Sequence, residues 1–95
     1  MDRIKFDDYE YIFSTEDLFK NGEPVYLRKK EKKLLTLLLK NKNLTVSNDK
    51  IISYVWNDEF KGKEPPIRQL INELRKKFDK DYIKTVVGVG YRFEI

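Results

Sequence analysis

The spacing of hydrophobic residues changes several times along the chain. Within residues 1–27, aromatic residues recur at every second position from Tyr9 to Phe13, and short apolar segments flank Asn21-Gly22. Alternation with a period of two indicates strands, and Asn-Gly favours a hairpin because both residues accept the positive φ of a tight turn. We therefore expect an N-terminal antiparallel sheet over residues 1–27.

Three later segments have a helical period instead. Helices are expected over residues 29–42, from Ser47 to near Asn57, and from Pro65-Pro66 onward. Ser47 offers an N-cap to the second helix, and a proline suits the first turn of the third. The apolar stripes that define the helices are Leu34, Leu35 and Leu38; Ile51, Ile52, Val55 and Trp56; and Ile67, Ile71, Leu74 and Phe78. Together these helices form an expected three-helix core over residues 28–81.

The last segment, residues 82–95, alternates again. Residues 83–87 lead to Gly88 and Gly90, which supply a bend, and residues 91–95 return as a second strand. The whole is an α+β fold with an N-terminal antiparallel sheet, three helices and a C-terminal β-hairpin. Because the outward face of the third helix is polar and flanked by basic residues, the pattern predicts a winged helix-turn-helix with the hairpin as its wing.

Length and composition exclude several classes of protein. The chain has 95 residues and neither His nor Cys, so we expect one domain over residues 1–95. The commonest zinc and copper ligands and the side chain that titrates near neutrality are missing. We therefore expect no enzyme activity, no metal and no cofactor. No apolar run approaches the roughly 20 residues of a membrane span, and the charged start does not suit a signal peptide, which predicts a cytoplasmic protein that binds no membrane.

The net charge of +4 is distributed unevenly. Residues 1–27 contain 3 basic and 7 acidic side chains, whereas residues 28–50 contain 8 and 2. Residues 51–66 contain 2 basic and 3 acidic side chains, and residues 67–95 contain 7 basic and 4 acidic side chains. An acidic N-terminal segment followed by two basic segments favours a polyanionic partner. The alternative is that the lysines simply form a solvated surface.

Several motifs appear in an order that points to one family. Val55-Trp56 precedes the third helix, which ends in Leu-Arg-Lys-Lys at residues 74–77, and Thr-Val-Val-Gly-Val-Gly-Tyr-Arg-Phe follows at residues 85–93. Over essentially its whole length the chain resembles the OmpR/PhoB-type winged-helix effector domain of bacterial two-component response regulators. The resemblance implies a four-stranded N-terminal sheet, three helices and a C-terminal wing, with the third helix in the major groove of DNA.

The resemblance and the helical wheel together assign candidate contacts to DNA. In the family, base-contacting positions correspond to Pro66, Gln69, Leu70 and Glu73, and the wheel independently turns Gln69, Asn72 and Glu73 outward. Gln can bind adenine, Glu can accept from cytosine, and Leu can pack on a thymine methyl group. The candidates for base contacts are Gln69, Leu70, Asn72 and Glu73. The candidates for contacts to the DNA backbone are Trp56, Lys63, Arg68, Arg75, Lys76, Lys77, Lys84, Thr85 and Tyr91.

Each candidate also has a structural alternative. The helix residues can be ordinary solvated side chains, Trp56 can close the core, and Arg75 can pair with Asp79 four residues later. Gly88 and Gly90 are interpreted as turn residues, since no third glycine or following helix completes a nucleotide-binding loop. Where many family members have an arginine that enters the minor groove, this chain has Val87.

The resemblance also implies partners. In the family the loop before the third helix can contact RNA polymerase, with Asp58, Glu59 and Phe60 as candidates, although a plain connecting loop is equally compatible. In the family a receiver domain precedes this domain in the full-length protein, so the chain is expected to be either a fragment of such a protein or a stand-alone regulator. Two copies would bind adjacent half-sites as a dimer on DNA, while the free chain is monomeric. The predicted function is sequence-specific binding of double-stranded DNA and regulation of transcription. The rival is a protein-interaction module that keeps the winged-helix shape without binding DNA.

Overall fold

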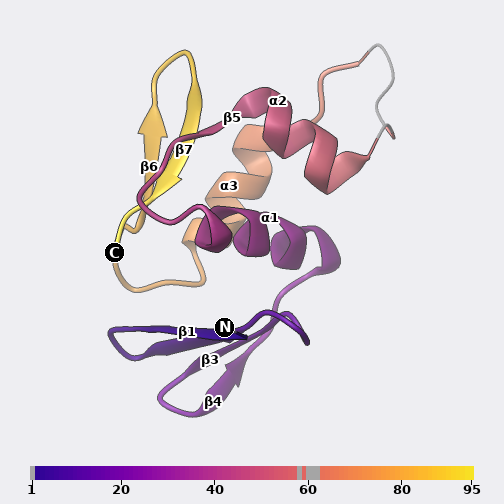
Figure 1. Cartoon of the computed structure of the whole chain (residues 1–95). Helices are drawn as coiled ribbons and strands as arrows, with labels where there is room; N and C mark the ends of the chain where they lie inside the picture. The colour runs from indigo at the N-terminus through magenta and orange to yellow at the C-terminus, as the bar shows by residue number, and fades with distance from the viewer. Residues whose placement is uncertain (1, 58, 60–62) are drawn as a thin grey trace.

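The chain begins with a four-stranded antiparallel sheet, seen at the bottom of Figure 1. This computed structural model describes residues 2–57, 59 and 63–95. Asn21 and Gly22 have φ values of 51° and 80°, so the predicted hairpin turn is confirmed. The strands follow one another in sheet order and are β1 (Arg3–Phe6), β2 (Tyr9–Ile12), β3 (Asp17–Lys20) and β4 (Glu23–Val25).

The predicted helices form, with differences at their ends. Ser47 Oγ accepts a hydrogen bond from the Lys50 N–H at 3.1 Å, which confirms the predicted N-cap. The second helix passes from α-helical to π-helical winding and ends at Trp56, followed by the C-cap residue Asn57, whose φ is 44°. The third ends at Arg75, so Phe78 reaches the core from the following turn and not from the helix. The helices are α1 (Lys29–Lys40), α2 (Asn48–Ile51), the π-helical η1 (Ile52–Trp56) and α3 (Ile67–Arg75).

The C-terminal hairpin belongs to a three-stranded sheet. Its strands are β6 (Ile83–Val86) and β7 (Gly90–Phe93), and the short β5 (Val46–Ser47), which the sequence did not reveal, pairs with β7. Gly88 lies in the turn with a φ of 76°, as predicted. The prediction for Gly90 was wrong: it lies in β7, where a Cβ atom would come within 1.9 Å of the Val46 carbonyl oxygen. Gly90 therefore allows β5 to approach the wing closely.

Aromatic residues from both ends of the chain join the N-terminal sheet to the helical core. Phe6 and Tyr9 contact Phe78, Tyr82 and Phe93 with ring-centroid distances between 5.0 and 6.1 Å. Such ring pairs add to the free energy of burial through edge-to-face contacts. The two ends of the domain therefore share one core.

Polar contacts reinforce this junction between the sheet and the segment after α3. The Tyr82 hydroxyl donates to Asp7, the Asp79 N–H donates to the Tyr9 hydroxyl at 2.9 Å, and Lys20 pairs with Asp79 at 3.0 Å. The hydrogen bond from Tyr82 lowers the pKa of Asp7 because it stabilises the carboxylate. No helix in the described ranges has the length and apolar character that crossing a membrane requires.

Candidate nucleic-acid interface

One side of α3 faces the core and the other is polar. Ile71 and Leu74 are fully buried. The exposed residues on or beside the outward face include Arg68, Gln69, Asn72 and Lys76, and Glu73 is half-buried. The base-contact candidates Gln69, Asn72 and Glu73 thus share a surface with cationic neighbours, which is the arrangement a polyanion requires.

Leu70 is not part of that surface. It is only 7% exposed and belongs to the hydrophobic core, so little of its side chain is available to a base, and its assignment as a base-contacting residue stays a prediction that burial disfavours. The physical reason is the width of the buried arc: a helix packed on a globular core buries more than a narrow stripe, and here the arc extends to the flank on which Leu70 lies.

Arg75 attaches the wing to α3. Its Nε and Nη2 atoms donate to the Ile83 carbonyl oxygen at 3.1 and 2.8 Å, and Nη2 also donates to the Thr85 hydroxyl at 3.0 Å. Its Nη1 atom donates to Asn72 Oδ1 at 3.2 Å. The alternative ion pair with Asp79 does not form, because that carboxylate pairs with Lys20. The guanidinium fork therefore fixes the first strand of the wing against the helix that precedes it.

The opposite strand of the wing is attached to the second helix. The Asn48 N–H donates to the Val89 carbonyl oxygen at 2.9 Å, and β5 pairs with β7 through Val46 and Tyr91. A groove of about 660 Å³ lies between the first turn of α2, residues 64–69 and Tyr91. This groove places the start of α3 beside the wing, so both elements can meet one extended ligand.

Two of the backbone-contact candidates are largely buried. Trp56 is 2% exposed, in agreement with the alternative that its indole closes the core, and Lys30 Nζ lies 6.0 Å from the centroid of its ring. Tyr91 is 9% exposed, and the Arg75 guanidinium lies 5.9 Å from its ring centroid. Tyr91 lines the groove between α2 and the start of α3.

The remaining candidates occupy different parts of the surface. Lys63 and Thr85 are exposed near α3 and on the wing. Lys84 pairs with Asp81 at 3.3 Å. Lys77 turns toward the segment after the N-terminal sheet, where its Nζ lies 5.6 Å from the Tyr26 ring centroid. Lys63, Arg68, Lys76 and Thr85 are thus exposed, whereas Lys77 is half-buried beside Tyr26.

The loop proposed to contact polymerase is only partly described. Glu59 is exposed and its carboxylate accepts two hydrogen bonds from Lys30 Nζ, at 3.0 and 3.1 Å. Asp58 and Phe60 lie outside the described residues. At the wing turn, Val87 is 90% exposed, so its side chain packs on almost nothing within the domain.

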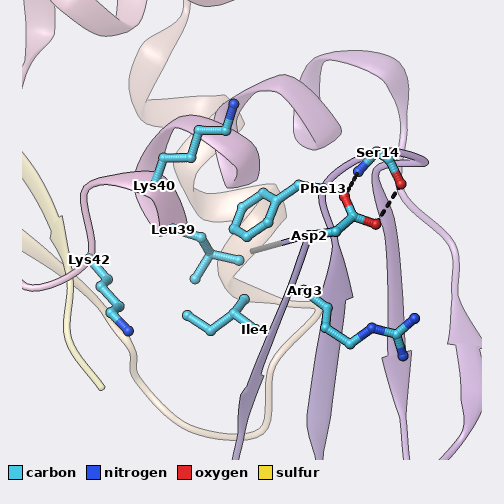
Figure 2. Close-up of a pocket in the computed structure, with 8 residues that line it drawn as sticks. All are labelled: Asp2, Arg3, Ile4, Phe13, Ser14, Leu39, Lys40 and Lys42. Carbon is cyan, nitrogen blue, oxygen red and sulfur yellow. Dashed lines mark hydrogen bonds between the residues drawn. The ribbon is translucent and has the colours of Figure 1, made fainter.

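Another hollow lies away from this face (Figure 2). It measures about 560 Å³ and lies between the first hairpin and the end of α1. Ile4, Phe13 and Leu39 form its apolar part, and Asp2 beside it accepts hydrogen bonds from the Ser14 N–H and hydroxyl at 2.9 and 2.7 Å. Neither α3 nor the wing contributes to its lining, so it is separate from the candidate interface.

These elements define the class of the protein. A compact set of helices, with the last helix exposing a polar face beside a hairpin that it holds in place, is a winged helix-turn-helix domain. Residues 22–93 match the family described as "Transcriptional regulatory protein, C terminal". The chain belongs to this family, and the resemblance to the OmpR/PhoB-type effector domain is confirmed. The family is one of transcription regulators and not a class of enzymes.

Relatives with curated sequences are longer than this chain. It is 38% identical over 74 residues to regulatory protein VanRB of Enterococcus faecalis and 36% identical over 97 residues to the uncharacterized transcriptional regulatory protein YclJ of Bacillus subtilis. The alignments cover 78% and 98% of this chain but 34% and 43% of the relatives. The chain therefore spans less than half the length of either relative.

Solved structures share the fold. The DNA-binding domain of CpxR from E. coli superposes with a TM-score of 0.85 at 22% identity, covering 97% of this chain and 95% of that one. The DNA-binding domain of Klebsiella pneumoniae RstA, solved in complex with the RstA box, has a TM-score of 0.84 at 22% identity. The superposition covers 99% of this chain and 98% of that one. DrrB, an OmpR/PhoB homologue from Thermotoga maritima, gives 0.84 at 29% identity and covers 99% of this chain and 45% of its own.

Proposed function

We propose that this chain binds double-stranded DNA sequence-specifically and regulates transcription, as the effector domain of a two-component response regulator in the bacterial cytoplasm. The observation that carries the proposal is the exposed polar face of α3, bordered by cations and by a wing that Arg75 holds beside it. An α-helix with such a face fits the major groove, and a neighbouring hairpin can reach the backbone or the minor groove.

In this proposal three residues of α3 face the base edges. Gln69 offers the paired donor and acceptor that adenine binds, and Glu73 can accept from the cytosine amino group. Asn72 uses its Oδ1 atom to accept from Arg75, which leaves its amide nitrogen to donate to a base. Leu70 is not included, because it is buried.

The contacts to the backbone come from cations and hydroxyls around this face. Arg68 and Lys76 on or next to α3, Lys63 before it and Thr85 on the wing are exposed and suit phosphate oxygens. Phosphate contacts release counterions, so the affinity should fall with salt with a slope of about −0.9 per neutralised phosphate. Arg75 acts here chiefly as a positioning residue, because four of the five N–H donors of its guanidinium are already used within the domain.

Two matched variants test the assignment. Gln69→Ala should weaken binding to the preferred site by about 1–3 kcal/mol and relax the preference at one base pair, whereas Lys76→Ala should weaken all duplexes alike. The preferred site is obtained by selection from a random duplex library. Equal losses on every sequence for Gln69→Ala would contradict its role as a base reader.

Partners beyond DNA follow from the family. We propose that a receiver domain adjoins this chain in the full-length regulator, that two copies bind half-sites about one helical turn apart, and that the loop containing Glu59 contacts RNA polymerase. The rival protein-interaction module would leave random duplex DNA unshifted at low salt. A clear shift that disappears as salt rises would exclude that rival.

A further inference from the structure

A second cationic surface lies on α1 and the second helix, away from α3. One groove of about 490 Å³ is lined by Lys33, Leu37, Lys50, Ser53, Tyr54 and Asn57. We call it the lysine groove. A smaller hollow of about 310 Å³ adjoins it and shares Lys33 and Asn57 with it. Lys29, Lys30 and Glu59 also line that hollow, so the two form one continuous cationic surface.

The charge of this surface is poorly compensated. Glu59 pairs with Lys30 at 3.0 Å. Among the residues that the structure describes, no ion pair is formed by Lys29, Lys33 or Lys50. Ammonium groups gathered without counter-charges repel one another, and a partner with carboxylates would relieve this repulsion.

The positions of these lysines are not explained by the stability of α1. Lys29, Lys30 and Lys33 lie in the first five residues of the helix, where the macrodipole disfavours cations, and Glu31 is the only acidic residue in its first turn. A helix selected for stability alone would have acidic residues there. The lysines therefore reduce the stability of the helix while creating the cationic surface.

The lysine groove also has an apolar part. Leu37 is 6% exposed and lies at its base, and Tyr54 is 42% exposed along its wall. From Lys29 to Leu37 the helix rises by about 12 Å at about 1.5 Å per residue. That length matches about four residues of extended peptide, so a short segment would contact the lysines and the tyrosine together.

Duplex DNA bound to α3 would not cover this groove. Asn48 and Asp49 line the groove beside α3 and the wing, whereas Lys50, Ser53 and Tyr54 line the lysine groove. The same helix thus presents two different sides to the two sites. The continuation of α2, η1, packs against α1, and in Figure 1 the wing lies on the side where α2 begins.

We propose that the lysine groove binds an acidic peptide segment of a partner protein, with carboxylates on Lys29, Lys33 and Lys50 and an apolar side chain against Leu37 and Tyr54. An acidic peptide fits this groove because its carboxylates complement the lysines and because the exposed Tyr54 offers a contact to an apolar side chain. The inference does not depend on DNA binding by α3, since the two surfaces share no lining residue.

The probe is a short fluorescent peptide of Asp and Glu with a central Phe, compared with an Asn and Gln version of the same length. On addition of the acidic peptide, the backbone amide signals of residues 29–37 and 50–57 should shift in ¹H–¹⁵N spectra, while those of residues 67–75 should stay in place. Binding measured by anisotropy should weaken with salt. Shifts that cluster on residues 67–75, or no binding at low salt, would overturn the proposal.

Charge-reversal variants provide the second arm. The double variant Lys33→Glu, Lys50→Glu should lower peptide affinity at least about tenfold, while the double variant Lys5→Glu, Lys42→Glu, with the same change of net charge at exposed positions, should lower it much less. Tyr54→Ala should weaken peptide binding without changing its salt dependence. Affinity for selected duplex DNA should be the same in both double variants. Equal loss of peptide affinity in the two, or a loss of DNA affinity only in the groove variant, would refute the assignment.

Discussion

Replacement of Arg75 by Lys separates two roles that a single arginine can have. Lysine keeps the positive charge but cannot reproduce the planar fork that reaches the Ile83 carbonyl, Thr85 and Asn72 together. If Arg75 positions the wing, the variant loses that geometry although its charge is unchanged. If Arg75 mainly neutralises a phosphate, the variant should behave almost like the wild type.

The size of the effect follows from the contacts. Four hydrogen bonds from the guanidinium are lost in whole or in part. Hydrogen bonds to charged groups contribute about 1.5–3 kcal/mol each when buried, but Arg75 is half-buried and water replaces much of each one. We expect the free energy of unfolding to fall by about 1–2 kcal/mol, which corresponds to roughly 5–10 °C in Tm.

Urea denaturation followed by circular dichroism measures the loss of stability, and amide hydrogen exchange locates it. Exchange should accelerate in β6 more than in α1 or the N-terminal sheet, because the wing opens locally. Affinity for duplex DNA should fall while the slope of its logarithm against salt stays constant. Wild-type exchange rates in β6 would refute the positioning role of Arg75.

Three further predictions concern the core and the junction between the sheets. Gly90→Ala should destabilise the domain by more than about 2 kcal/mol, since its new methyl group overlaps the Val46 carbonyl oxygen; thermal melting measures this, and an unchanged Tm would contradict it. Leu70→Ala should cost about 2–4 kcal/mol in stability without changing the preferred DNA sequence, and a changed preference in site selection would contradict its burial. Asp7 has a lowered pKa in the folded chain, chiefly through Tyr82, so its contribution to stability is complete above about pH 4 and is lost as the pH falls below that value. Asp7→Asn should therefore flatten the acid limb of a plot of Tm against pH, and an unchanged limb would argue against this contact.

Local signals account for the parts of the fold that the sequence predicted. Asn21-Gly22 specifies its own turn, and Ser47 caps its own helix through Lys50 three residues later. Each signal involves neighbours in the sequence, and the structure confirms each one. The polar outward face of α3 was predictable for the same reason, because helical periodicity alone distinguishes Gln69 from Ile71.

The features that escaped prediction depend on distant neighbours. The two-residue strand β5 is too short to show a period, and it forms because β7 pairs with it. Leu70 was assigned from the family resemblance, and the helical wheel did not exclude it because a wheel does not show how widely the core extends around α3. For Arg75 the spacing allowed a pair with Asp79 as the structural alternative, but the folded chain brings Ile83 and Thr85 to the guanidinium and Lys20 to Asp79.

The junction between the two ends of the chain has a consequence for the order of folding. Asp7 and Tyr82 are 75 residues apart in the sequence, and Tyr9 and Asp79 are 70 apart. During synthesis Phe6 and Tyr9 leave the ribosome long before Phe78, Tyr82 and Phe93, so this part of the sheet lacks its aromatic partners until the C-terminal segment is made, although Tyr11 can already contact α1. Contacts of such high sequence separation form slowly because closing the intervening loop costs entropy. The contacts of Phe6, Asp7 and Tyr9 with the C-terminal segment are therefore expected to form after the sheet has packed on α1.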